Sequence, residues 1–316
     1  MSLFFIPLDG SDMSTTLANA LGIAALVCWS MNTAVTRHLG EAHPFGMPGL
    51  SFTVAGLALI LLDRIRSKPL PWRSDASPKF WYLCGGAFAA YLLLYTSGLT
   101  YADSRLVVLP LGLINYFWPS LILMLMPWFF PCRVKWGILA VGALLCVAGV
   151  GMSFLWGMPL DGFVGVFAVT WPAFLMMAAA ALLWAFYSNA ARKWGGTANG
   201  VGWFQLAGGL CFLALWRMRG GDLGLDASIF VPFLIHALII NAAAYTFWDC
   251  GVRRGDIGLM GALANFLPLG SVLFGSWYLG DATTPGLWLG GLLVTCGAAL
   301  CRKGTGKDSK GEVHRE

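Results

Sequence analysis

Charge is scarce in this chain of 316 residues, and its scarcity indicates the class of protein. Charged residues make up 11% of the sequence, whereas a soluble domain has about 25%. Hydrophobic residues make up 58%, and the mean hydropathy is +0.72. So few charges cannot cover a water-exposed surface, and the composition therefore predicts an integral membrane protein.

The residue groups that carry out catalysis or bind metals are missing as well. The eight cysteines are scattered, with no CxxC motif and no Cys/His pairing, so we expect neither disulfides nor a metal site. The sequence contains no phosphate-binding loop and no nucleophile elbow. A membrane-embedded enzyme would need a polar catalytic constellation, so we predict no enzymatic activity and no cofactor.

Residues 1–15 lack the features of a signal peptide. They carry Asp9 and Asp12, no Lys or Arg, and an apolar stretch too short for the core of a signal sequence. We therefore expect 1–15 to be a cytoplasmic N-terminal segment, followed by a first span that stays in the mature protein.

Long apolar runs occupy the rest of the chain. Ten of them are long enough, at about 20 residues each, to cross a hydrocarbon core of about 30 Å as helices. Their hydrophobicity is continuous, whereas barrel strands alternate every second residue, so an all-α membrane protein is predicted. The predicted spans are Thr16–Thr36, Phe45–Leu62, Phe80–Leu99, Leu106–Phe130, Val134–Leu155, Val166–Ala190, Ala198–Trp216, Ile229–Val252, Ile257–Leu279 and Thr284–Cys301.

The basic residues fall mostly on one side of these spans. Sixteen of the 20 Lys and Arg lie in the loops after the even-numbered spans or in the tail at 302–316. The opposite loops hold only Arg37, Arg105, Arg217 and Arg219. This positive-inside bias places both termini in the cytoplasm. The net charge of +5 is therefore a sign of topology and does not indicate nucleic-acid binding.

One pattern of residues occurs twice. Trp29-Arg37-Gly40 returns as Trp184-Arg192-Gly195, 155 residues later. Further matches in the same order join Tyr95-Gly98-Asp103 to Trp248-Gly251-Asp256 and Asn115 and Pro119 to Asn265 and Pro268. A duplication is predicted, with repeats at 16–155 and 166–301. Each repeat has five spans, an odd number, so the second copy is inverted, and inverted repeats favour a transporter with alternating access.

Aromatic rings make up 14% of the residues, and several share a helical face with polar side chains. A stripe that combines rings with amides or hydroxyls needs a partner helix, water or a ligand, because lipid does not satisfy its polar atoms. Each stripe alone fits polar contacts between helices, whereas together they favour a ring-lined cavity for an aromatic or bulky apolar ligand. The stripes are Trp29 with Asn32, Tyr91 with Tyr95, Asn115 with Trp118, Trp184 with Tyr187, and Asn241 with Tyr245 and Trp248.

Ionisable side chains are almost absent from the spans. Asp249 could pair with Arg253 at a helix end or relay protons, and His236 could be packed and neutral or contact a proton or substrate. No span centre carries the Lys or Arg that an anionic cargo needs, or the deep acid that a multivalent cation needs. The predicted cargo is therefore neutral or zwitterionic, with a sizeable apolar part.

Pro119 and Pro268 occupy corresponding places in the fourth and ninth predicted spans. Each removes a backbone donor and could free carbonyls that meet a ligand's ammonium group, although a simple packing kink fits equally well.

The ten spans in two inverted halves, the repeated Trp-to-Arg segment, Tyr95-Thr96-Ser97-Gly98 and Asn115-Tyr116-Phe117-Trp118-Pro119 resemble the EamA branch of the drug/metabolite transporter superfamily. Within that branch they are similar to bacterial aromatic amino acid exporters.

The resemblance implies a basket-shaped bundle in the bacterial inner membrane. Its cavity would be lined mainly by the third, fourth, eighth and ninth spans, with help from the first and sixth, which adds Asn265 to the site. It also implies export of aromatic amino acids, with lipophilic cations or neutral metabolites as the alternative cargo. Branches of the superfamily that exchange protons through a membrane acid have it in the first span, whereas this first span has Asn32 and no carboxylate. The sequence therefore does not predict proton coupling.

Overall fold

The computed structural model describes residues 13–43, 45–67, 70–101, 105–131, 133–156, 160–196, 198–221, 227–255, 257–280 and 283–306. Nearly all of these residues are helical, as predicted. The strands in the described ranges are β1 (Arg133–Val134) and β2 (Thr305–Gly306), which pair antiparallel next to the C-terminal tail. The fold is therefore an all-α membrane bundle.

The helices of the first half follow the predicted spans closely. They are α1 (Thr15–Trp29), α2 (Asn32–Ala42), α3 (Gly46–Ile65), a 3-10 turn at Pro71–Arg73, a π-helical turn at Phe80–Cys84 that leads into α4 (Gly85–Tyr101), α5 (Arg105–Asn115), α6 (Trp118–Phe129) and α7 (Trp136–Leu155). The first and fourth predicted spans are therefore each divided into two helices near the centre.

The second half repeats most of this arrangement. Its helices are α8 (Leu160–Trp194), α9 (Val201–Met218), a 3-10 turn at Ala227–Ile229, α10 (Phe230–Leu234), a π-helix at Ile235–Ala243, α11 (Ala244–Arg254), α12 (Ile257–Ala264), α13 (Leu267–Leu279) and α14 (Pro285–Lys303). The ninth predicted span is divided like the fourth, whereas the sixth is one unbroken helix of 35 residues.

The number of membrane spans is lower than ten by length and composition alone. Among the described residues, eight helices are long and apolar enough to cross, and the bent pair α1 and α2, at 41°, makes a ninth. The pair α12 and α13 occupies the place of the ninth predicted span, but only the short apolar helix α13 is recognised there. A count of ten stays a prediction.

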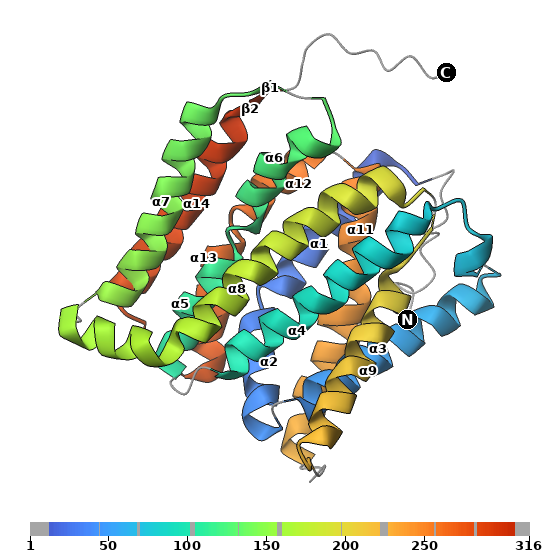
Figure 1. Cartoon of the computed structure of the whole chain (residues 1–316), viewed down its shortest axis with the longest axis horizontal. Coiled ribbons are helices and arrows are strands. Elements are labelled where there is room, and N and C mark those ends of the chain that lie inside the picture. The colour runs from blue at the N-terminus through green and yellow to red at the C-terminus, as the bar shows by residue number, and fades with distance from the viewer. Residues whose placement is uncertain are drawn as a thin grey trace.

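Glycines hold two helix pairs in close contact, α3 with α9 and α7 with α14, which lie side by side in Figure 1. A Cβ on Gly56 would lie 2.7 Å from the carbonyl oxygen of Gly202, and one on Gly149 would lie 2.6 Å from that of Gly290. Such contacts are possible only without a side chain. In each of the four helices the glycines come in pairs seven residues apart: Gly49 and Gly56, Gly202 and Gly209, Gly142 and Gly149, Gly290 and Gly297.

The two pairs run antiparallel and join one half of the chain to the other. Gly49 faces the turn of Gly209 while Gly56 faces that of Gly202, so α3 and α9 point in opposite directions. The central helices follow the same rule, since α4 packs on α8 and, with the halves exchanged, α11 packs on α1. This exchange of partners is the packing expected of the predicted inverted duplication, which stays a prediction.

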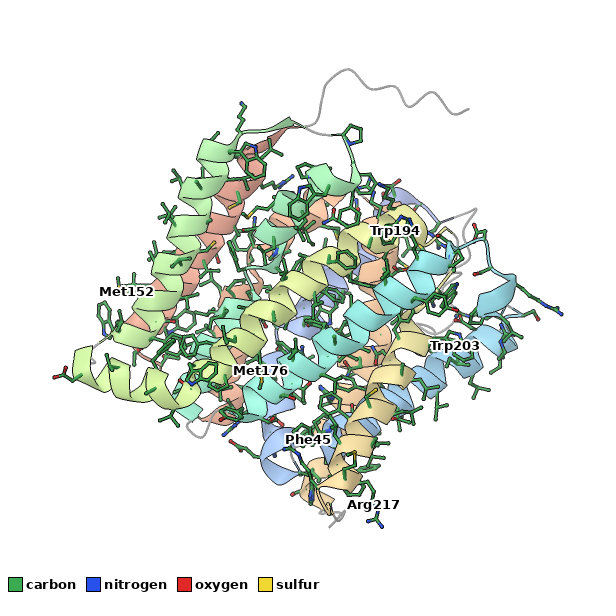
Figure 2. The ribbon with its side chains drawn as sticks, viewed as in Figure 1. Phe45, Met152, Met176, Trp194, Trp203 and Arg217 are labelled. Atoms are coloured by element: carbon green, nitrogen blue, oxygen red, sulfur yellow. The ribbon has the colours of Figure 1, made fainter. Side chains whose placement is uncertain are left out.

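One end of the bundle gathers the loops that were predicted to share a side. The backbone N–H of Ser77 donates to the Trp194 carbonyl at 3.0 Å, and that of Lys135 donates to the Gly304 carbonyl at 2.7 Å. The Lys79 ammonium lies 5.6 Å from the centroid of the Trp194 ring. We call this end the basic face. Trp194 lies toward it, whereas Phe45 and Arg217 lie toward the other end, the opposite face (Figure 2).

Arg37 is buried close to the opposite face and closes the end of α4. Its Nε donates to Glu41 Oε1 at 2.9 Å, and its Nη1 donates to the Leu99 carbonyl at 2.9 Å. The guanidinium therefore compensates for the free carbonyls at the C-terminal end of a membrane helix, where a cation is stabilised. Arg192, its counterpart in the sequence repeat, lies at the basic face over the ring of Phe130 instead.

Candidate functional site

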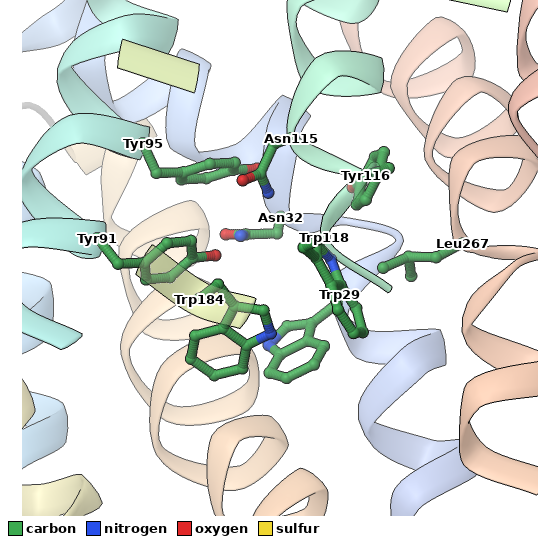
Figure 3. Close-up of a pocket in the computed structure, with 9 residues that line it drawn as sticks. All are labelled: Trp29, Asn32, Tyr91, Tyr95, Asn115, Tyr116, Trp118, Trp184 and Leu267. Atoms are coloured by element: carbon green, nitrogen blue, oxygen red, sulfur yellow. The ribbon is translucent and has the colours of Figure 1, made fainter. Parts of the chain in front are cut away.

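A buried cavity lies where the divided helices meet in the centre of the bundle (Figure 3). Its free space for the centre of a water molecule is about 10 Å³, which is room for roughly one water. The protein's own rings fill the remaining space, so a larger ligand has to displace them. The lining residues are Trp29, Asn32, Tyr91, Tyr95, Asn115, Tyr116, Trp118, Trp184 and Leu267.

Prolines begin the helices that follow two of the breaks. Pro119 and Pro268 lie in the first turns of α6 and α13, directly after the breaks. A proline is well tolerated there because the first turn has no internal partner for its missing N–H. The predicted correspondence of the two prolines in the two halves is thus seen in the structure. They mark helix starts, not kinks inside continuous helices.

A cluster of aromatic side chains lies between the cavity and the basic face; we call it the aromatic cluster. Trp29 and Trp184, the pair matched by the sequence repeat, meet edge to face at 5.7 Å between ring centroids. Trp29 also contacts Tyr245 at 5.0 Å, and Trp184 contacts Tyr91 at 4.9 Å. Such ring pairs prefer edge or offset geometry and contribute beyond the area they bury. The further members of the cluster are Phe88, Trp118, Tyr187, Phe204 and Trp248.

Four hydroxyl groups meet on the other side of the cavity, one turn closer to the opposite face; we call them the hydroxyl network. Thr33 Oγ1 lies 3.1 Å from Tyr95 Oη and 3.2 Å from Tyr116 Oη. Tyr116 Oη donates to Ser271 Oγ at 3.0 Å, and Ser271 Oγ donates to Thr33 Oγ1 at 3.3 Å. The network joins α2, α4, the α5–α6 break and α13, so it connects both halves of the chain.

A second polar group surrounds His236 in the π-helix and reaches the cavity through Asn32; we call it the histidine network. His236 is 1% exposed, and its ring nitrogens lie within hydrogen-bond distance of Thr36, Ser51 and Asn241. Thr36 Oγ1 in turn donates to Asn32 Oδ1 at 3.1 Å. His236 is therefore a packed residue and not a water-exposed one. Of the predicted Asp249–Arg253 pair, the Arg253 side chain is outside the described part of the structure.

Two buried polar atoms of the cavity lining have no hydrogen-bond partner. They are Nε1 of Trp29, a donor, and Oδ1 of Asn115, an acceptor. Leaving such an atom unpaired costs about 1–3 kcal/mol, so both are available to a polar ligand. The lining contains no charged side chain, and this combination suits a molecule that is neutral or zwitterionic.

The structure gathers most of the predicted site residues, although in three groups. Trp29, Asn32, Tyr91, Tyr95, Asn115, Trp118 and Trp184 line the cavity. The rings of Tyr187, Tyr245 and Trp248 contact that lining within the aromatic cluster. Asn241 belongs to the histidine network, and Asn265 lies in the α12–α13 break, 4% exposed and outside the lining.

Four residues of the cavity lining and the hydroxyl network were not predicted: Thr33, Tyr116, Leu267 and Ser271. Tyr116 lies in the α5–α6 break, where helical spacing no longer relates neighbouring side chains. The one signal that pointed to it was its position inside the segment from Asn115 to Pro119 that carried the family resemblance. Thr33 and Ser271 make their contacts across helices, which a single sequence does not reveal.

Known proteins resemble this chain over nearly its whole length. Residues 171–302 match the EamA-like transporter family. The chain is 26% identical over 305 residues to the aromatic amino acid exporter YddG of Salmonella typhimurium, covering 92% of this chain and 98% of that protein. It is 30% identical over 270 residues to the exporter of the same name in Ancylobacter novellus, covering 83% and 88%. A solved structure described as "Crystal structure of protein" shares the fold with a TM-score of 0.66 and 25% identity, covering 91% of this chain and 96% of that one.

Proposed function

Because the chain belongs to the EamA-like transporter family, we propose that it exports the aromatic amino acids phenylalanine, tyrosine and tryptophan from the cytoplasm. The observation that carries this proposal is the central cavity, which combines stacked rings with an unpaired donor and an unpaired acceptor and has no charged side chain. An aromatic amino acid offers a ring for the first feature and a zwitterion for the second.

The proposed mechanism is alternating access across the bacterial inner membrane, with both termini and the basic face in the cytoplasm. The substrate ring enters among Tyr91, Trp118 and Trp184 and replaces contacts that these side chains make with one another. Its ammonium and carboxylate groups are held by asparagine side chains and by backbone groups at the helix breaks. The two five-helix repeats, 16–155 and 166–301, supply the two sides of the cavity.

The cavity is nearly filled in this structure, which fits a closed state between the two open ones. With room for about one water, it admits an indole ring only after Trp29, Trp118 and Trp184 separate. The protein rings lose contacts with one another but gain similar contacts with the substrate ring. The net change in buried apolar surface, and in its free energy, is therefore small. Binding then depends on the polar groups of the ligand.

The test is uptake of radiolabelled tryptophan into liposomes that contain the purified protein, with and without a pH gradient, against empty liposomes. We expect uptake that unlabelled phenylalanine and tyrosine inhibit, and its response to the gradient shows whether protons drive it. Uptake equal to that of empty liposomes, in protein shown to be folded, would refute aromatic amino acids as the cargo.

Lipophilic cations are the second candidate, because the same rings favour them. A flat cation can lie over the face of Trp or Tyr, at about 0.5–2 kcal/mol for each contact. A viologen that inhibits tryptophan uptake competitively and is itself transported would show a shared cavity. A viologen that is transported where tryptophan is not would assign the cavity to cations alone.

A further inference from the structure

His236 is enclosed by polar side chains from three separate segments, and its surroundings fix which of its ring nitrogens carries a proton. Ser51 Oγ from α3 lies 2.7 Å from Nδ1, and Asn241 Nδ2 lies 3.2 Å from Nδ1 and 3.5 Å from Nε2. Thr36 Oγ1 from α2 lies 3.0 Å from Nε2. The Phe52 ring packs against the imidazole at 5.5 Å between centroids, and the residue is 1% exposed.

The hydrogen bonds can be assigned one proton at a time. The amide oxygen Oδ1 of Asn32 only accepts, so Thr36 Oγ1 donates its one hydroxyl proton to it. Thr36 Oγ1 therefore accepts from Nε2 of His236, which carries the ring proton. In a neutral imidazole one nitrogen donates and the other accepts, so Nδ1 accepts from Ser51. Asn241 Nδ2 lies near both ring nitrogens and does not decide between them.

Through Thr36, the position of the proton on His236 determines which end of the Asn32 amide faces the cavity. As long as Nε2–H of His236 donates to Thr36 Oγ1, the one proton of Thr36 stays on the side of Asn32 Oδ1, at 3.1 Å. The amide oxygen of Asn32 is thereby occupied, and its Nδ2, which carries two protons, is the end left for the cavity that Asn32 lines. With the opposite tautomer of His236, the Asn32 oxygen would be the free end.

We propose that His236 is a positioning residue that acts through Thr36 to make Asn32 a hydrogen-bond donor toward the substrate carboxylate. This inference rests on the proposed transport of amino acids. It divides the cavity into two polar subsites. Asn32 Nδ2 and the unpaired Nε1–H of Trp29 receive the carboxylate, and the unpaired Oδ1 of Asn115 receives the ammonium group.

The first experiment compares uptake of tryptophan with uptake of tryptophan amide, which has the same ring and ammonium group but no carboxylate. Thr36→Val keeps the shape of the side chain and removes the hydroxyl, and His236→Leu removes the donor. Both variants should lower tryptophan uptake at sub-saturating concentration about tenfold, the effect of losing a hydrogen bond to a charged group. Uptake of the amide should change less than threefold.

Two matched variants separate positioning from a general structural role. Thr36→Ser keeps the hydroxyl, and His236→Gln places an amide N–H near the position of Nε2, so both should retain the preference for tryptophan over its amide. Equal losses for tryptophan and the amide in Thr36→Val and His236→Leu would overturn the proposal. So would loss of the preference in Thr36→Ser.

The second measurement does not depend on transport. The sequence has four histidines, so the nitrogen NMR signals of His236 can be assigned in protein with ¹⁵N-labelled histidine by their loss in His236→Gln. We expect a neutral ring with the proton on Nε2, and a proton on Nδ1 would overturn the proposal. If the wild-type protein moved neither compound, the proposed function would fail, and the tautomer would still decide the direction of the hydrogen bonds.

Discussion

The two ends of the cavity are formed by residues at corresponding positions of the two predicted repeats, but their side chains differ in chemistry. Toward the opposite face, Asn32, Ser51 and Asn241 belong to the histidine network. The residues that lie 155, 153 and 153 positions away from them in the other repeat are Tyr187, Phe204 and Phe88. These three rings contact one another at 5.0–6.3 Å toward the basic face.

This difference indicates how each end can open. A polar group that leaves its protein partners forms hydrogen bonds with water, so the net loss of free energy is small. Exposing the histidine network to water therefore costs little. Water does not replace ring contacts, and exposing Phe88, Tyr187 and Phe204 costs about 25 cal/mol for each Å² of apolar surface. Two halves with a similar order of helices are thus expected to open at unequal free-energy cost, with the polar end opening more readily.

The largest effect on stability is expected when Phe88, at the aromatic end, is replaced by asparagine, the residue at the corresponding position 241 of the polar end. Phe88 is fully buried, and Phe88→Asn removes a ring, at about 3–5 kcal/mol, and buries an unpaired amide, at about 1–3 kcal/mol more. The free energy of unfolding in detergent, measured by titration with SDS, should fall accordingly. Phe88→Leu is the control and should cost less than half as much; similar losses in the two variants would show that the amide adds nothing.

The cavity between the two ends should show the largest effect on transport. Trp118→Ala and Asn115→Ala should each lower tryptophan uptake about tenfold or more, because they remove a ring contact and an acceptor from the lining. Trp288, on α14, is 37% exposed, and Trp288→Ala should change uptake less than twofold. Equal losses in all three variants would count against the cavity as the binding site.

At the polar end, removal of the amide should cost less than the exchange at the aromatic end. Asn241→Leu removes a donor that lies near both ring nitrogens of His236 but leaves Ser51 at 2.7 Å to donate to Nδ1. We expect a loss of about 1–2 kcal/mol in the free energy of unfolding, again by SDS titration. A loss as large as that of Phe88→Asn would remove the proposed difference between the ends.

The smallest effect on stability is expected for a substitution in the hydroxyl network. Thr33→Val keeps the shape of the side chain and removes the oxygen that Tyr95, Tyr116 and Ser271 share. Because Tyr116 and Ser271 remain bonded to each other, only the Tyr95 hydroxyl loses the contact that it makes with Thr33, and the loss should be about 1 kcal/mol, the low end of the range for one unpaired atom. The unfolding midpoint measures it, with Thr33→Ser as the variant that should stay close to wild type.

The helices could be predicted because the membrane fixes the length of an apolar run. The predicted span Phe45–Leu62 corresponds to α3 (Gly46–Ile65), and Thr284–Cys301 corresponds to α14 (Pro285–Lys303). The break at Ser30 and Met31 was missed because no proline or glycine marks it. The sixth span was predicted too short, since α8 continues at both ends beyond the most apolar stretch.

The site could be predicted in part, where side chains on one α-helix share a face. Tyr91 and Tyr95, one turn apart on α4, both line the cavity as expected. Asn241 and Tyr245 have the same spacing but separate, because Asn241 lies in the π-helix, whose wider turns rotate it away from the face of Tyr245. The hydroxyl network depends on contacts between helices far apart in the sequence, so helical spacing does not predict it.

The glycine contacts couple the two halves of the chain. Each contact pair, such as Gly56 with Gly202, has one member in each half, so a larger residue on one side requires an accommodating change some 150 positions away. In the predicted duplication, these are the surfaces at which two separate copies of one unit would have joined. Mutations at these glycines are therefore constrained as they are at the interface of an obligate dimer, although the two partners are translated from a single message.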